Sequence, residues 1–128
     1  MTRFFLSFAA LSGFLAVALG AFGAHALRGR LDAYAQGVYE TAVQYHFVHT
    51  LALLAVALLS RDILVHSRWL LASGAGFIAG LIVFCGSLYL LSLTGQRWLG
   101  AVTPLGGLAF LVGWASLAGW ALTSARPA

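Results

Sequence analysis

Four long apolar stretches without Asp, Glu, Lys or Arg constrain the fold of this chain more than any other feature; they cover residues 4–27, 41–60, 69–95 and 98–125. A bilayer core about 30 Å thick is crossed by roughly 20 apolar residues of α-helix. Inside lipid the backbone N–H and C=O groups must bond within the segment, so runs of this composition are expected to be helical. The sequence therefore predicts an all-α fold, an integral membrane bundle of four transmembrane helices.

The composition leaves no room for a soluble domain. Hydrophobic residues make up 62% of the chain and charged residues only 8%, whereas soluble domains carry about a quarter charged residues. All seven cations are arginines, and each lies near the end of an apolar run. A nucleic-acid reader needs a continuous basic stripe, so no nucleic-acid partner is expected. Residues 1–128 are predicted to form a single transmembrane domain in contact with membrane lipid.

The first apolar stretch has an alternative interpretation as a secretory signal, because Ala24-His25-Ala26 resembles a cleavage site. The apolar region of a signal is usually about 7 to 15 residues long, and this stretch is longer. We expect it to be retained as a membrane span.

Residues near the ends of the stretches predict where helices begin. Asp32 is placed to cap the second helix ahead of residues 41–60. Thr103 and Pro104 pair a capping hydroxyl with a proline at the first helical position, so the fourth span is expected to run over 104–125, with 96–102 as an interfacial connection. Trp114 lies within this span and is expected to be a packing residue.

Small residues recur every fourth position on three of the predicted helices. Such stripes allow close helix–helix contact, which lipid does not otherwise drive. The residues are Ser12, Ala16, Gly20 and Ala24 on the first helix, Ala72, Gly76 and Gly80 on the third, and Ala109 and Gly113 on the fourth. They are expected to close the bundle; the alternative is that one stripe docks a partner or a second copy of the chain.

Polar side chains concentrate on the side of the membrane away from the termini, which predicts a polar vestibule about half a bilayer deep. Its members are His25, Glu40, Gln44, Tyr45, His46, His49, Thr50, Cys85, Ser87, Tyr89, Ser92, Thr94 and Thr103. The candidate site within it consists of His25, His46, His49, Ser87 and Tyr89.

His46 and His49 share one helical face and are expected to point inward, toward residues 85–89 and His25, because an unpaired imidazole in hydrocarbon is costly. Three interpretations remain open. The rings hold the bundle together by hydrogen bonds, pass a proton or bind a small molecule, or ligate a metal or haem. No cofactor is predicted, and the absence of any catalytic signature argues against an enzyme.

Arginine counts give the expected orientation, since the cytoplasmic side carries the excess. Four arginines, Arg3, Arg61, Arg68 and Arg126, lie on the side of the termini and three, Arg28, Arg30 and Arg97, on the other. The termini are expected to be cytoplasmic.

Four motifs together resemble the family known as domain of unknown function 423, whose eukaryotic relatives are called transmembrane protein 256. They are GAFGAH (20–25), TAVQYHFVH (41–49), FCGSLYLLSLTG (84–95) and TPLGGLAFLVGW (103–114). The resemblance covers nearly the whole chain and implies a multi-pass protein of the bacterial cytoplasmic membrane without an established activity. Family members usually read FSGSLY, so Cys85 stands where serine is typical, which argues against a thiol ligand.

Three functions follow as hypotheses. The first is a non-enzymatic binding or accessory subunit of a membrane complex. A membrane protein complex or a homo-oligomer is the expected kind of protein partner. The second is a small channel or carrier that uses His46 and His49 for protons or a small solute. The third is a metal- or haem-binding membrane protein with these histidines as ligands.

Overall fold

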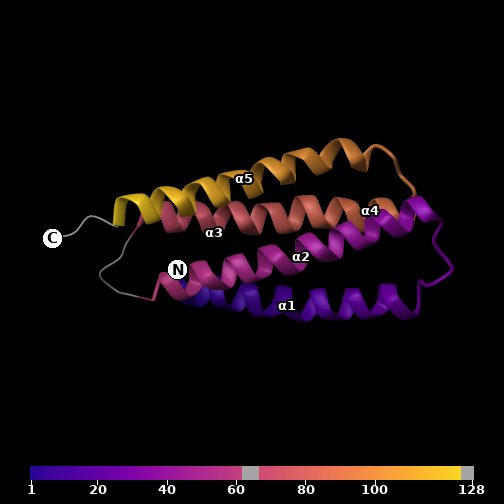
Figure 1. Ribbon diagram of the computed structural model, residues 1–128, viewed down its shortest axis with the longest axis horizontal. Helices are drawn as coiled ribbons and strands as arrows, with labels where there is room; N and C mark the ends of the chain where they lie inside the picture. Colours follow the sequence, from indigo (N-terminus) through magenta and orange to yellow (C-terminus); the bar gives the residue numbers. More distant parts are fainter. Residues whose placement is uncertain (62–66, 125–128) are drawn as a thin grey trace.

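The computed structural model describes residues 1–61 and 67–124, and over them the chain is an antiparallel array of four long helical segments (Figure 1). These are α1 (Thr2–His25), α2 (Ala33–Leu59), a continuous third segment made of α3 (Arg68–Gly80), η1 (Leu81–Cys85) and α4 (Gly86–Thr94), and α5 (Leu99–Ser124). Each of the four is long and apolar enough to cross a membrane. The predicted all-α class with four transmembrane helices is confirmed.

Helix α2 begins where the sequence predicts, because the Asp32 side chain accepts a hydrogen bond from the backbone N–H of Ala35 at 2.7 Å. The start predicted for the fourth span is wrong. Helix α5 begins at Leu99, so Pro104 stands inside the helix. The Thr103 hydroxyl bonds back to the carbonyl of Leu99 at 3.2 Å and lies 2.7 Å from the Ser87 hydroxyl, so it is not a cap. Ala125, the last residue of the predicted span, and Arg126, used for orientation, lie outside the described residues.

The segments pack in the order α1, α2, third segment, α5, with α1 mainly against α2 and α5 mainly against the third segment (Figure 1). The buried core therefore lies along α2 and the third segment, and its largest fully buried side chains are Tyr39, Leu53, Leu70 and Phe77. Only 22% of the most apolar window of α1 and of α5 is buried, against 44% for α2 and 50% for the third segment. The outer faces of α1 and α5 are left for lipid to cover.

The small residues form contacts inside this single chain. A Cβ on Gly76 would lie 2.8 Å from the carbonyl oxygen of Ala109, so α3 and α5 touch through their backbones. Gly80 and Gly113 make room for aromatic rings, Phe110 and Phe77 respectively. Gly20 faces Val43 and Phe47 of α2 at ordinary van der Waals distance. All four glycines predicted for helix packing thus lie at helix–helix contacts of the bundle.

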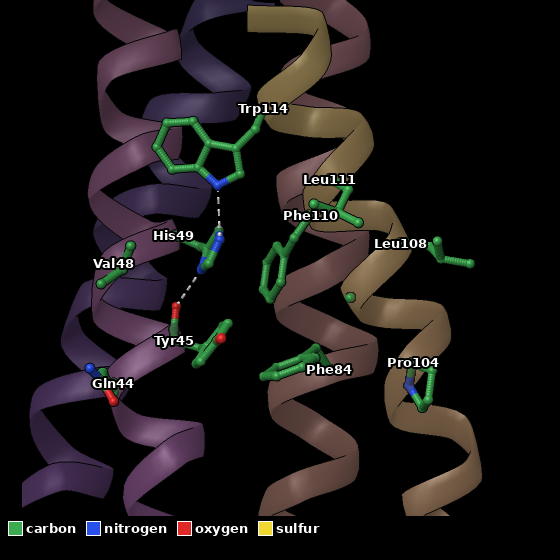
Figure 2. A pocket seen from close by; sticks show the side chains of 11 residues that line it. Gln44, Tyr45, Val48, His49, Phe84, Pro104, Leu108, Phe110, Leu111 and Trp114 are labelled. Carbon is green, nitrogen blue, oxygen red and sulfur yellow. Dashed lines mark hydrogen bonds between the residues drawn. The ribbon is translucent and has the colours of Figure 1, made fainter.

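The π-helical turn η1 in the third segment has no counterpart in the sequence prediction. It contacts α5 closely: a Cβ on Gly106 would fall 2.6 Å from the Cα of Phe84. A π turn is wider than an α turn and is often associated with functional sites. Here it brings Phe84 into the gap between α2 and α5 (Figure 2).

Candidate functional site

The first polar cluster is a hydrogen-bonded chain centred on His46, which is 7% exposed. Its Nδ1 lies 2.9 Å from the Tyr89 hydroxyl and its Nε2 lies 3.0 Å from the Ser12 hydroxyl. Ser12 lies 2.6 Å from the Thr50 hydroxyl. These hydrogen bonds therefore join α1, α2 and α4 in the middle of the bundle.

Every group in this chain both donates and accepts hydrogen bonds. When the Tyr89 hydroxyl donates to Nδ1, the Nε2–H donates to Ser12, which donates to Thr50. In the other tautomer all the bonds reverse. All three hydrogen bonds thus form with either tautomer of His46, and both ring nitrogens bond to protein groups.

The second cluster surrounds His49, which is 6% exposed. The indole N–H of Trp114 donates to its Nε2 at 3.1 Å, and its Nδ1 lies 2.8 Å from the carbonyl oxygen of Tyr45 (Figure 2). The indole can only donate and the carbonyl only accept, so the neutral ring carries its proton on Nδ1. The ring also stacks on Phe110, with centroids 3.6 Å apart at 15°. His49 is therefore fixed between α2 and α5.

A groove with a volume of 790 Å³ lies between α2 and α5 beside this cluster. Figure 2 shows its aromatic wall, which includes Tyr45, Phe84, Phe110 and Trp114. Gln44 supplies an amide. No hydrogen bond joins the Gln44 amide or the Tyr45 hydroxyl to another group of residues 1–61 and 67–124. The groove is an aromatic cleft with two polar groups that have no partner there.

A second groove, of 410 Å³, lies on the other side of α2, between α1 and the third segment. It reaches Ser12, His46 and Tyr89, whose polar groups are already bonded to one another. The remainder of its wall is apolar apart from Cys85, which is a free, buried thiol. Apart from this thiol, a weak donor, the groove offers no hydrogen-bonding group without a partner.

The structure divides the predicted vestibule into separate parts. His46 lies against Tyr89, as expected, but His49 faces Trp114 and Phe110 of α5, away from residues 85–89. His25 ends α1 and is exposed, so the expectation that both rings face it is wrong. Ser87 bonds to Thr103 rather than to a histidine. Glu40 is exposed and accepts from Gln36 at 2.9 Å.

The two histidines do not converge on a common ligand. The ring of His46 bonds to α1 and α4, and that of His49 to α5 and its own helix. Among the residues that the structure describes, no group of three or more His, Cys, Asp or Glu side chains is placed to hold a metal ion. A metal would have to displace an existing hydrogen bond of either ring.

Sequence reasoning missed three participants of the second cluster and its groove. Trp114 was expected only to pack, although it donates the bond that orients His49. Phe84 and Phe110 form the wall of the groove and were not singled out. Trp114 carries the one available signal, because the N–H of a tryptophan in the middle of a span has no water to bond and normally finds a protein acceptor.

These features define a class: a small, four-span helical membrane protein whose buried polar side chains bond across its helices. The family model described as a protein of unknown function, DUF423, matches residues 19–107. The chain belongs to this family of uncharacterised multi-pass membrane proteins.

Curated relatives cover most of the chain. The UPF0382 membrane protein YwdK of Bacillus subtilis is 47% identical over 86% of this chain and 89% of its own. The UPF0382 inner membrane protein YgdD of Escherichia coli K12 is 45% identical over 86% of this chain and 82% of its own. A Staphylococcus aureus relative, the UPF0382 membrane protein SAB0533, is 40% identical over 86% of this chain and 88% of its own. These bacterial relatives are all named membrane proteins, and the Escherichia coli relative is named an inner membrane protein. No solved structure matches the chain.

Proposed function

We propose that this chain is a non-enzymatic binding protein of the membrane, and that the groove between α2 and α5 binds a lipid-soluble molecule with a hydrogen-bonding group. The observation that supports this is the pair formed by Gln44 and Tyr45. Both belong to a membrane-spanning helix and line the groove, and neither side chain bonds to another described residue. An unpaired polar group in an apolar medium costs roughly 2 kcal/mol or more, so an occupant that pairs with them is favoured.

The size of the groove favours a compact ligand over a partner helix. Its volume of 790 Å³ is within the range of about 300–1,000 Å³ that small-molecule sites occupy. Along α5 it extends from Pro104 to Trp114, which is about 15 Å of helix. A transmembrane partner would run along about 30 Å of bilayer core. The small-residue stripes give no separate support for an accessory subunit, because they are used within the bundle.

The chemistry of the wall suggests the kind of molecule. Phe84, Tyr45 and the stacked pair of His49 and Phe110 offer flat faces, and ring faces pack well against other planar or unsaturated groups. Tyr45 and Gln44 offer both donors and acceptors. We therefore propose an amphiphile with a flat or unsaturated apolar part and one polar end.

The test is to purify the protein from its membrane in mild detergent, extract it with organic solvent and identify enriched lipid-soluble compounds by mass spectrometry. Gly107→Phe places a ring in the groove, because Gly107 lines it and a Cβ there would lie 3.8 Å from the Phe84 ring. Leu105→Phe is the matched control, since Leu105 is on the same helix, is exposed, and does not line the groove. We expect one compound to be enriched with the wild type and the control and lost with Gly107→Phe.

Two results would overturn this proposal. One is an extract that matches the bulk lipid for all three proteins. The other is a stoichiometric protein partner that is lost with Gly107→Phe, which would assign the groove to an accessory role in a membrane complex.

A second candidate function, proton transfer, is favoured by the chain of Tyr89, His46, Ser12 and Thr50, whose bonds reverse as a unit. These hydrogen bonds span only the middle of the bundle. Tyr89 lies about 8 Å of helix from the end of α4, and Ser12 lies about 15 Å of helix from the start of α1. Proteoliposomes that contain a pH-sensitive dye test it. Proton flux that Tyr89→Phe abolishes would support this function, and no flux above empty vesicles would exclude it.

A further inference from the structure

A polar hollow of 290 Å³ at one end of the bundle has a composition unlike that of the two grooves. It forms where the connection between α1 and α2 meets the connection between α4 and α5, at the end of the bundle away from the N-terminus (Figure 1). Arg30 lines it from the first connection and Arg97 from the second. The other polar residues of its wall are Asp32, Tyr34 and Ser92. Two cations that are 67 positions apart in sequence (97 − 30) therefore share one small cavity.

Backbone geometry fixes this meeting of the two connections. Gly95 ends α4 with φ +72°, a left-handed conformation that other residues rarely adopt. Its N–H bonds to the carbonyl of Leu91 at 2.9 Å, and the chain then turns directly into α5. On the other side, the Asp32 cap holds the start of α2. Both arginines are thus carried on short, ordered turns.

The hollow lies at the level of the lipid headgroups. It is beyond the last residue of α1, His25, and at the end of α4, Thr94. Trp98 follows Arg97 and is exposed, as is usual for a tryptophan at the membrane interface. No ion pair joins Arg30 or Arg97 to a carboxylate in the described parts of the chain. Guanidinium groups at this level bind phosphate oxygens well, because their planar set of donors matches phosphate geometry.

We infer that this hollow binds the phosphate group of an anionic phospholipid, with Arg30 and Arg97 as its ligands. Asp32 lowers the affinity of the site for an anion, since its carboxylate faces the same cavity and repels negative charge. The source is the membrane itself, because the hollow opens at the headgroup layer; free inorganic phosphate is the alternative source of the same chemistry. This site is separate from the groove between α2 and α5, so neither proposal depends on the other.

The experiment is native mass spectrometry of the purified full-length chain in detergent, titrated with phosphatidylglycerol, phosphatidylcholine or inorganic phosphate. We expect one phosphatidylglycerol to be retained by the wild type in preference to phosphatidylcholine. Arg30→Gln with Arg97→Gln should weaken retention roughly tenfold or more, given the usual contribution of each arginine near an anionic surface. Asp32→Asn should strengthen it, because asparagine still caps the helix but carries no charge.

The matched control is Arg28→Gln with Arg61→Gln, which removes the same two charges from exposed residues outside the hollow. It should retain phosphatidylglycerol like the wild type, and circular dichroism should show equal helix content in all variants. If both double variants lost phosphatidylglycerol equally, net charge alone would explain the binding, and the proposal of a site in the hollow would be overturned. Retention of inorganic phosphate without lipid, or equal retention of both lipids, would overturn the assignment to an anionic phospholipid.

Discussion

Trp114 of α5 donates its indole N–H to Nε2 of His49 on α2 across 3.1 Å. This bond links two helices that both pack against the third segment, and it lies beside the stack of the same imidazole on Phe110. It also orients the imidazole toward the aromatic groove, as Figure 2 shows. Because the bond joins the two helices, replacing either side chain is expected to change the stability of the bundle.

Trp114→Phe should destabilise the bundle by about 0.6 to 1.7 kcal/mol, the average and the maximum measured for hydrogen bonds between membrane helices. The ring is kept in part, but Nε2 of His49 loses its donor. Thermal unfolding in detergent measures the change. Trp98→Phe is the control, since Trp98 is exposed and makes no side-chain hydrogen bond to the residues described. Equal midpoints for the two variants would contradict a structural role of the bond.

His46→Leu should destabilise the chain more than His46→Gln, because leucine leaves both Tyr89 and Ser12 without their partner, whereas an amide still donates and accepts. A double-mutant cycle with Tyr89→Phe isolates the contact between the two side chains. We expect a coupling energy of about 0.5 kcal/mol or more for a direct bond. A coupling of zero would mean that the ring and the hydroxyl do not interact.

Gly76→Ala should destabilise the contact of α3 with α5, since its Cβ would lie 2.8 Å from both the Ala109 carbonyl oxygen and the Gly113 nitrogen. Backbone atoms of a packed helix cannot move aside easily, so we expect a loss of about 1–3 kcal/mol, as for overpacked cores. Gly37→Ala is the opposite case. A Cβ there meets nothing within 4 Å, and alanine in a helix gains roughly 0.5–1 kcal/mol over glycine. Unfolding midpoints that shift in the same direction would refute this explanation.

Both ends of the chain should lie on one side of the membrane, because four spans bring the end of α5 back to the start of α1 (Figure 1). Reporters active only in the cytoplasm, fused to either end, should therefore agree, and activity of both is the result that the arginine counts favour. A reporter inserted between α1 and α2, after Gly29, is the control and should give the opposite result. Disagreement between the two ends would mean that one segment does not span.

The relatives do not supply an activity, so the groove and the hollow stand on the geometry of this chain. They differ in chemistry: aromatic rings with two polar groups in the first, and two arginines with one carboxylate in the second. A lipid-soluble ligand and a phospholipid phosphate are both available only in the membrane, which is where the family is found.

The sequence by itself determined the class of this protein. Uncharged runs long enough to cross the bilayer must be helical there, because no water is present to bond the backbone. Asp32 marked the start of α2 because capping depends on neighbouring residues. The resemblance carried by four motifs identified the family.

Only the tertiary structure decided which polar groups meet. His46 and His49 share a face of α2, yet one bonds to α1 and α4 and the other to α5, because the face lies along the boundary between two sets of neighbours. The Thr103 hydroxyl likewise bonds to Ser87 of another helix instead of capping α5, which begins at Leu99. Periodicity gives the direction of a side chain from its own helix, but a hydrogen bond or a cavity needs a second helix at a particular distance and rotation. That placement comes from glycines such as Gly76 and Gly106 against a particular partner backbone, a contact that a single sequence does not specify.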